Sequence, residues 1–248
     1  MRQKTALCFL TVRPSSEFYR YAKTFRDQYD VFICIADDAY EIDGYDGVLP
    51  LIKIDRKLAE KAGFKNSVLW CKNRACSRDK ALFYFSLVDL GYRNIWLIEE
   101  DVFIPSPQAL IDIDNQQASQ SADLLSAKNE IFGTDTPLPK WHWKKLKGRI
   151  GLPWARSMIC ATRVSVELLA AIKAYAVKNK TLFLDEALFP TLALHHQLEV
   201  ATPPELSTIL YQVEWRVEQL IPSNLYHPVK DFSEHQRFRE ALVLKKAN

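Results

Sequence analysis

Three consecutive carboxylates, Glu99, Glu100 and Asp101, stand between two apolar runs, residues 95–98 and 102–104. A short unbroken apolar run is typical of a strand that is covered on both faces, so the acids should lie at the tip of a buried strand. Because unpaired charge at the edge of a core is strongly unfavourable, we expect a cation there, either a divalent metal or Lys and Arg side chains. Ligands bind at the carboxyl ends of strands in open α/β sheets, which makes this stretch a candidate active site.

The spacing of these acids indicates what they could bind. Side chains alternate along a strand, so Glu99 and Asp101 share one face and Glu100 points away. An E-x-D pair on one face can hold a divalent ion, which leaves Glu100 for a ribose hydroxyl or a Lys. The alternative is that all three acids form a solvated turn at the strand end.

A second pair of acids, Asp185 and Glu186, follows the apolar residues 182–184 at the predicted start of a helix. Asp185 is well placed as an N-cap, and Glu186 lies where the helix dipole favours negative charge. These structural roles could account for both acids. A carboxylate between apolar neighbours can also have its basicity tuned by burial, and for this reason we favour Glu186 as a general base.

His227 and Lys230 flank a turn near the C-terminus that Pro228 stiffens. A His nitrogen can bind a metal ion, and a Lys ammonium can neutralise a phosphate. A single His is more often a packed or surface residue, and the acid cluster is what strengthens the metal interpretation.

Residues 140–149 form a basic stretch that contains Trp141 and Trp143 and no acid. Indole faces stack on sugars or bases, and cations suit phosphates, so this stretch could contact an acceptor or a membrane surface. The alternative is a solvated loop that its Trp side chains anchor to the core. Further polar and cationic groups lie upstream of the acids: Asn73 and Arg74 in a polar loop, and Arg78 and Lys80 in the next predicted helix. Phosphate contact and simple solvation fit the loop residues equally well.

Strands and helices alternate along the chain. Apolar runs predict strands at 6–12, 31–36, 124–128 and 157–161, with a weaker edge strand at 47–54. Helical spacing predicts a helix capped by Ser15 or Ser16. It predicts others at 77–90, capped by Ser77, from Pro107 to about Asn115, and at 165–178 and 186–197. A long loop is expected over 137–153. This order favours one α/β domain with a doubly wound sheet.

Composition excludes several classes of protein. The formal net charge of +3 is too small to argue for nucleic acid. With only 7 Gly, the chain contains neither G-x-G-x-x-G nor G-x-x-x-x-G-K-[ST], which counts against a Rossmann dehydrogenase and a P-loop NTPase. No segment approaches the roughly 20 apolar residues of a membrane span.

The five cysteines are scattered. Cys8, Cys34 and Cys160 lie in apolar runs, where a thiol behaves as a small hydrophobe. Cys71 and Cys76 form a C-x₄-C pair with no second pair, which counts against a zinc site. An odd number in scattered positions suits a reducing compartment, so we expect a cytoplasmic protein.

The succession of these features resembles the GT-A glycosyltransferases, which use nucleotide-sugar donors. The residues W-L-I-E-E-D-V resemble the family's D-x-D metal motif, with Glu99 and Asp101 in the acid positions and Glu in place of the first Asp. The segment that opens at Arg156, R-S-M-I-C-A-T-R-V-S-V-E-L-L, resembles the one that lines the sugar site. L-D-E-A-L-F-P-T-L-A resembles the segment that supplies the base in inverting members, and Y-H-P-V-K resembles the C-terminal metal and diphosphate ligands.

The resemblance implies a fold, a reaction and a set of ligands. The fold would be a GT-A-like, Rossmann-like mixed sheet flanked by helices, in a single two-lobed domain with a nucleotide-sugar donor half (1–118) and an acceptor half (119–248). The reaction would transfer a sugar to a hydroxyl of a glycan or glycoconjugate, with inversion. Glu186 or Asp185 would be the base, and Glu99, Asp101 and His227 would hold Mn²⁺ or Mg²⁺. Substrate would contact Asp37, at the nucleoside, and Asn73, Arg74, Lys80, Glu100, Trp141, Trp143, Arg156 and Lys230.

Two other classes remain open from the sequence. A sugar-phosphate nucleotidyltransferase has a similar half-sheet and metal acids, but it normally carries a Gly-rich loop where this chain reads T-V-R-P-S-S-E-F. A non-catalytic module that binds nucleotide or carbohydrate is the second. Nucleic acid is not an expected partner, and residues 140–149 could place the protein at a membrane surface.

Overall fold

The computed structural model describes the whole chain except residues 1–3, 134, 136–137, 212 and 248. The strands are β1 (Thr5–Thr11), β2 (Asp30–Ile35), β3 (Leu51–Ile52), β4 (Asn94–Glu99), β5 (Leu124–Phe132), β6 (Trp154–Ser165) and β7 (Val200–Ala201). The α-helices are α1 (Ser16–Lys23), α2 (Arg56–Lys61), α3 (Ser77–Leu87), α4 (Pro107–Asn115), α5 (Gln117–Ser121), α6 (Val166–Asn179), α7 (Asp185–His195) and α8 (Phe232–Ala247). Short 3₁₀ helices are η1 (His142–Lys145), η2 (Pro204–Leu206) and η3 (Val217–Gln219).

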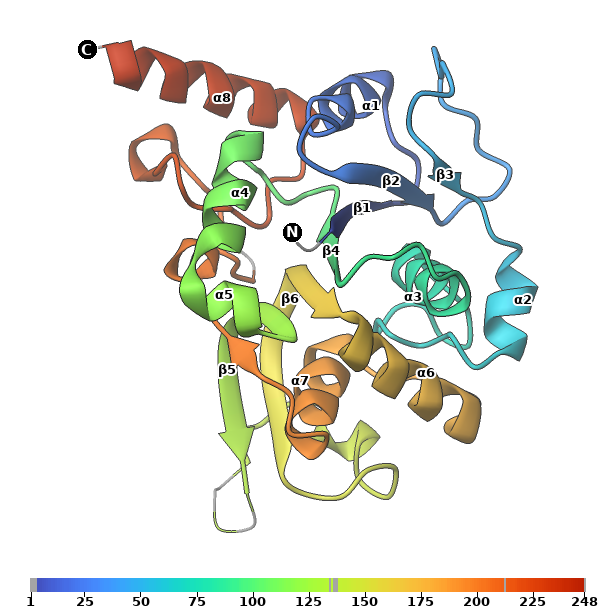
Figure 1. Cartoon of the computed structure of the whole chain (residues 1–248). Coiled ribbons are helices and arrows are strands. Elements are labelled where there is room, and N and C mark those ends of the chain that lie inside the picture. Colours follow the sequence, from blue (N-terminus) through green and yellow to red (C-terminus); the bar gives the residue numbers. More distant parts are fainter. Residues whose placement is uncertain (1–3, 134, 136–137, 212, 248) are drawn as a thin grey trace.

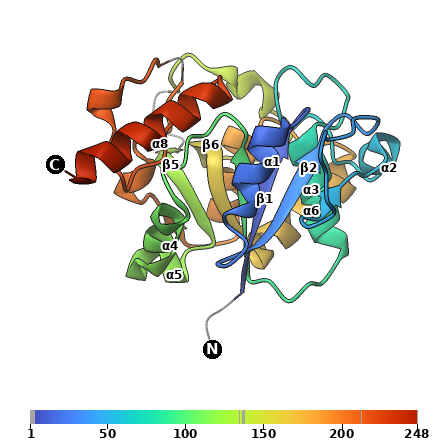
Figure 2. The same cartoon turned by 90° about the horizontal axis from the view of Figure 1, so that it is seen from above.

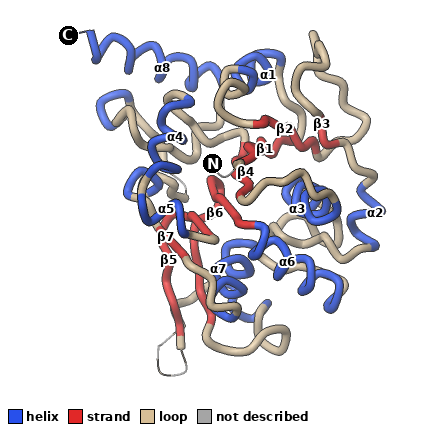
Figure 3. The backbone as a smooth tube through the Cα atoms, viewed as in Figure 1, coloured by secondary structure: helices blue, strands red, loops and turns tan. Residues whose placement is uncertain are grey.

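These strands form one mixed sheet of seven strands in the order β3-β2-β1-β4-β6-β5-β7 (Figure 3). The strands β3, β2, β1 and β4 are parallel to their neighbours, whereas β6 runs antiparallel to β4 and to β5. The predicted mixed sheet flanked by helices is therefore confirmed. Strand β3 lies at the sheet edge, as the Pro before it predicts.

Helices cover both faces of the sheet (Figure 1). Alternate residues of β1 explain why: Ala6 and Cys8 pack into the core beneath α3, α6 and α7, while Leu7 and Phe9 pack into the core beneath α1 and α4. Viewed from above, α4, α5 and α8 lie on the side away from α3 and α6 (Figure 2). A strand buried on both faces reads as a continuous apolar run, which is the pattern of β1, β2 and β4.

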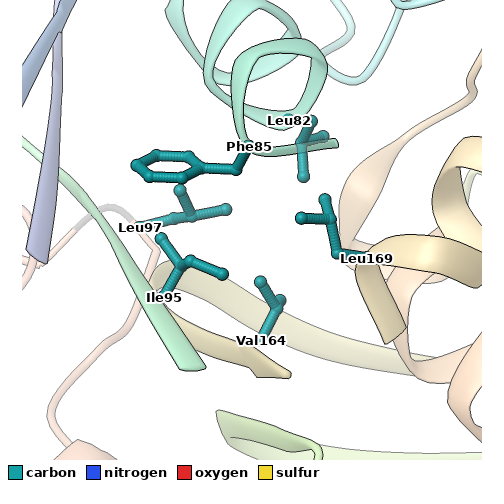
Figure 4. Close-up of a pocket in the computed structure, with 6 residues that line it drawn as sticks. All are labelled: Leu82, Phe85, Ile95, Leu97, Val164 and Leu169. Atoms are coloured by element: carbon teal, nitrogen blue, oxygen red, sulfur yellow. The ribbon is translucent and has the colours of Figure 1, made fainter. Parts of the chain in front are cut away.

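Six apolar side chains close the core between α3, β4, β6 and α6 (Figure 4). Leu82 and Phe85 come from α3, and they meet Ile95 and Leu97 of β4. The remaining members are Val164 and Leu169. This region is packed core that fixes α3 against β4, and the position of α3 in turn decides where its polar first turn lies.

Local capping agrees with the sequence in some places and differs in others. The Ser15 hydroxyl accepts a hydrogen bond from Phe18 N at 3.1 Å, and Ser165 accepts one from Leu168 N at 3.1 Å, so both helices start at a Ser cap. The expected caps of the other two helices were wrong by one residue. Helix α3 is capped by Cys76 with Asp79 in a capping box, and helix α7 has Leu184 at its N-cap, so Asp185 is the first helical residue.

Helix α8 docks through a buried histidine. The His235 ring lies between Phe103 and Phe232, and its Nε2 is 2.8 Å from the carbonyl oxygen of Val229. Because a carbonyl only accepts, the neutral ring carries its proton on Nε2. Burial lowers the pKa of His235 to about 4, so the folded protein holds this ring uncharged.

We therefore expect the free energy of unfolding to fall as the pH is lowered from 6.5 to about 4. In that window the unfolded chain binds the proton and the folded chain does not, which corresponds to about 3 kcal/mol at about 1.4 kcal/mol per pH unit. Urea unfolding at a series of pH values measures the effect. The variant His235→Phe should lose this slope, and an unchanged slope in the variant would contradict the assignment.

Candidate active site at the carboxyl end of the sheet

A buried arginine joins the two acid clusters that the sequence singled out. Alternation along β4 turns Glu99 to the same face as Ile95 and Leu97, beneath α3. Arg78 in the first turn of α3 is 2% exposed; its Nη2 lies 2.7 Å from Glu99 Oε1 and its Nε lies 2.8 Å from Asp185 Oδ2. Its Nη1 also donates to the carbonyl of Ile159 at 2.9 Å. Arg78 is thus one of the cations that the acidic strand tip requires.

Arg78 does not neutralise all the negative charge nearby. Burial raises the pKa of Asp185 to about 8, an effect that Arg78 opposes. Burial also raises the pKa of Glu186, opposed by Arg78 and reinforced by Glu99. For Glu100, burial is again the main cause of a raised pKa, and Asp101 and Glu99 add to it. Because burial disfavours the charged forms of these carboxyl groups, a further cation nearby would stabilise them.

His227 reaches the acidic tip through backbone pairing. Phe103 and Tyr226 form an antiparallel bridge, and Val229 N donates to Asp101 O at 2.8 Å, so the turn that contains His227 lies directly against the end of β4. Its Nε2 lies 3.6 Å from Asp101 Oδ2 and 3.9 Å from Glu99 Oε2. The structure therefore brings together the three residues predicted to hold a metal.

The ring orientation of His227 fixes which nitrogen faces the acids. Nδ1 is 2.7 Å from the carbonyl oxygen of Leu210, so the neutral ring carries its proton there. Nε2 is then the nitrogen that faces the two carboxylates. Three electron-pair donors that converge in this way suit a cation between them, and a backbone carbonyl behind a His ligand is a common arrangement in metal sites.

Asp101 and Lys230 form an ion pair at the rim of this group. The Lys230 side chain is largely exposed, and Asp101 and Glu99 raise its pKa against the lowering effect of burial. A charged ammonium therefore stands beside the acids with donors open to solvent. That position suits an anionic ligand.

Cys160 enters the site from β6. The antiparallel register of β4 and β6 pairs Ile98 with Ala161, so the next residues along the two strands are Glu99 and Cys160. The Cys160 sulfur, a Glu99 oxygen and a His227 nitrogen all lie within 4.8 Å of one another. The sequence interpretation of Cys160 as a small core hydrophobe was incomplete, because its side chain is only partly buried and borders the acids.

Glu186 and Arg156 lie on the side of the site that α7 and β6 provide. Asp185 is almost fully buried; besides its ion pair with Arg78 it accepts a hydrogen bond from Glu186 N at 2.8 Å. Glu186 is only partly buried, and among the described residues no side chain donates a hydrogen bond to its carboxylate in the structure. Arg156 pairs with Glu130, at 3.0 Å from Nε, and covers the ring of Trp141 at 5.4 Å.

The two Trp residues of the basic stretch differ in their surroundings. Trp143 is buried, stacks on Trp154 at 5.8 Å and donates to Pro139 O at 3.0 Å, so it anchors the loop. Trp141 is half-buried and lies against Arg156. The side chains of residues 144 and 145 lie outside the described part of the chain.

Other residues predicted to contact substrate are already bound to protein groups. Lys80 is fully buried and donates to the carbonyls of Ile35 and Ala36 and to Asp38, so it fixes the loop after β2 and does not reach into solvent. Glu100 turns away from Glu99, as alternation predicts, and accepts a hydrogen bond from Thr11, not from a Lys. Asp37 is held by Arg13 at 2.7 Å at the same end of the sheet.

A separate hollow of about 280 Å³ lies beside the start of α7. Leu182, Phe183 and Leu184 form one wall, and Asn73 and Arg149 contribute polar groups. Further lining residues are Asn66, Val68, Leu69 and Lys72. Of the two polar loop residues predicted to bind substrate, Asn73 lines this hollow, whereas Arg74 is exposed and does not.

Comparisons with known proteins give likenesses of structure alone. No family model matches the sequence, and no curated protein matches it. The galactosyltransferase LgtC, in complex with donor and acceptor sugar analogues, aligns over 95% of this chain and 94% of its own with a TM-score of 0.49 and 9% identity. An active-site mutant of LgtC aligns over 96% and 95%, with a TM-score of 0.49 and 9% identity.

A third solved structure is the 4-diphosphocytidyl-2C-methyl-D-erythritol synthase of Anaerococcus prevotii. It aligns over 97% of this chain and 96% of its own, with a TM-score of 0.46 and 8% identity. At such low identity a likeness does not extend to the chemistry of a site. In the described part of the chain, no helix is long and apolar enough to cross a membrane.

Proposed function

We propose that the chain is a GT-A-type glycosyltransferase that moves a sugar from a nucleoside-diphosphate donor to a hydroxyl acceptor. The observation that carries this proposal is the convergence of Glu99, Asp101 and His227 beside the exposed ammonium of Lys230. Acids and a His nitrogen suit a divalent cation, and the ammonium suits a phosphate. Together they form a place for a diphosphate at the end of β4.

The donor set fits a divalent ion, since an oxygen of Glu99 and an oxygen of Asp101 lie 3.9 and 3.6 Å from the same ring nitrogen of His227. Glu99, Asp101 and His227 would hold Mn²⁺ or Mg²⁺. Such an ion, when bound, neutralises charge on a departing diphosphate. Lys230 would contribute to the same neutralisation through hydrogen bonds to phosphate oxygens.

Glu186 is the base in this proposal. Its carboxylate would take the proton of the acceptor hydroxyl while that oxygen bonds to the anomeric carbon and the bond from that carbon to the diphosphate breaks. A single displacement of this kind inverts the anomeric centre. Asp185 is the alternative base, but its ion pair with Arg78 and its burial favour a role in holding Arg78.

The remaining contacts follow from the same arrangement. We assign residues 1–118 to the donor half, with Asp37 at the nucleoside, and residues 119–248 to the acceptor half. Trp141 and Arg156 lie near Glu186 and would contact sugar, and the hollow that Asn73 lines would receive part of the acceptor.

The test is thermal stabilisation by UDP-, GDP- and dTDP-sugars with and without Mn²⁺, followed by slow hydrolysis of the stabilising donor. Because a ligand at 100 times its Kd stabilises the folded state by about 2.7 kcal/mol, a genuine donor should raise the melting temperature measurably. The stabilisation should depend on Mn²⁺ and should be followed by release of nucleoside diphosphate.

Variants and products separate this proposal from its rivals. Asp101→Asn should abolish the Mn²⁺-dependent part, while Asp112→Asn, at an exposed acid of α4, should not. Stabilisation without any release of sugar would indicate a binding module. Pyrophosphate formed from a nucleoside triphosphate would indicate a nucleotidyltransferase, and either result would overturn the proposal.

A further inference from the structure

The cation site contains a soft ligand that the acid motif does not include. Cys160 lies opposite Glu99 because the antiparallel ladder of β4 and β6 ends one residue earlier, at Ile98 and Ala161. Its sulfur lies within 4.8 Å of both Glu99 and His227 ligand atoms. Three side chains from three separate segments therefore offer one oxygen, one sulfur and one nitrogen to the same point.

Each of these atoms is free to bind an ion. Oε1 of Glu99 is paired with Arg78, and Oε2 is the oxygen that faces His227. His227 Nδ1 is hydrogen-bonded to Leu210 O, so Nε2 is the ring nitrogen that faces the acids. Cys160 is a free cysteine, so its sulfur is not tied up in a disulfide.

We propose that Cys160 supplies a thiolate to this site, so that it prefers a thiophilic divalent cation such as Zn²⁺ or Co²⁺ over Mg²⁺. The inference rests on the proposed function, in which Glu99, Asp101 and His227 hold a divalent ion. Thiolate and imidazole select transition metals, whereas Mg²⁺ prefers sites built from oxygen alone. Binding converts the Cys160 thiol into a metal-bound thiolate and releases one proton to solvent.

The geometry also leaves a position for substrate. For a thiophilic ion, Cys160 would take the place of Asp101 in the ligand set: Asp101 is paired with Lys230, whereas the ligand atoms of Glu99, Cys160 and His227 all lie within 4.8 Å of one another. Three protein ligands with one open position are typical of catalytic zinc sites, where the open position takes water or substrate. A diphosphate oxygen of the donor is the group that this position would accept.

The experiment is a Co²⁺ titration of the full chain followed by absorption spectroscopy. A thiolate bound to Co²⁺ gives a charge-transfer band in the near ultraviolet, and ligand-field bands in the visible report Co²⁺ binding by any ligands. The wild-type chain should show both. Cys160→Ser should lose the charge-transfer band, and Cys71→Ser, at a half-buried cysteine before α3, should keep it.

Competition gives the second readout. Zn²⁺ should displace Co²⁺ from the wild-type chain at a far lower concentration than Mg²⁺. The variant Cys160→Ser should bind Zn²⁺ at least about tenfold more weakly, since even an indirect partner of a metal ligand contributes that much. Cys160→Ala and circular dichroism of both variants exclude a folding defect as the cause.

The possible failures are distinguishable. Ligand-field bands without a charge-transfer band, or a charge-transfer band that persists in Cys160→Ser, would overturn the role of Cys160 and leave a divalent ion on Glu99, Asp101 and His227. No Co²⁺ binding at all would overturn both the role of Cys160 and the proposed metal site.

Discussion

The variant Glu186→Gln is expected to lower kcat for sugar transfer by about 10²–10⁴-fold, the usual contribution of a general base. The amide keeps the size of the side chain but cannot take the acceptor proton. Because Glu186 is not one of the residues assigned to the metal or the diphosphate, donor affinity should change little. Initial rates and donor thermal shifts on the same samples measure the two effects separately.

A matched control comes from the first turn of another helix. Glu167 opens α6 as Glu186 opens α7, but it is exposed. Glu167→Gln should therefore leave transfer unchanged. If Glu186→Gln turned over at the wild-type rate, Glu186 would not be the base; Asp185→Asn would then be the next variant to assay.

The pH dependence of sugar transfer should also reflect the titration of Glu186. Burial raises the pKa of Glu186, opposed by Arg78 and reinforced by Glu99. A base acts only when deprotonated, so kcat should rise with pH through a value above the ordinary range of a glutamate. The residual activity of Glu186→Gln should not show this rise with pH. If the rise persisted in the variant, the titrating group would be a residue other than Glu186.

The variant Arg78→Met is expected to lower the free energy of unfolding by about 3–5 kcal/mol, the usual cost of removing one partner of a buried ion pair. Met fills much of the volume of the arginine stem, so the loss arises mainly from charge. Asp185 would remain buried without its cation, and Glu99 would lose the partner of its Oε1. Urea unfolding measures the change.

Two further variants isolate the electrostatic cause. Arg20→Met removes an exposed arginine paired with Glu17 on α1 and should have a much smaller effect. Arg78→Met combined with Asp185→Asn should recover part of the stability, because the double variant buries no uncompensated charge. Equal destabilisation by the single and double variants would show that packing, not charge, is what Arg78 contributes.

Local sequence patterns predicted most of the elements, since they depend on neighbours along the chain. Continuous apolar runs identified β1, β2 and β4, because a strand covered on both faces needs no polar side. Strand ends were less accurate: β6 extends from Trp154 to Ser165 where 157–161 was expected, since its C-terminal part contains polar residues, Thr162, Arg163 and Ser165, that the structure buries. The start of α3 was expected at a Ser cap, but Cys76 and Asp79 form the cap.

Within the site, the sequence identified acids and bases but not their partners. It predicted Glu99 and Asp101 on one face and Glu100 on the other, because alternation is a local property of a strand. It placed Lys80 among the residues that contact substrate, whereas the structure buries this ammonium against two carbonyls. Whether one Lys side chain is buried depends on which loop covers it in the folded protein. The residues next to Lys80 in the sequence do not indicate this.

The acidic tip of β4 and its need for a cation were determined by the sequence alone, since apolar residues on both sides of three acids force charge to the edge of a core. Which groups answer that need was decided by the tertiary structure. Arg78 reaches Glu99 because α3 packs on β4. Cys160 lies beside Glu99 because β6 runs antiparallel to β4, and His227 lies there because the residue before it, Tyr226, pairs with Phe103. These pairings join residues far apart in the chain, and their energy comes from burial of whole faces, which no local pattern of residues records.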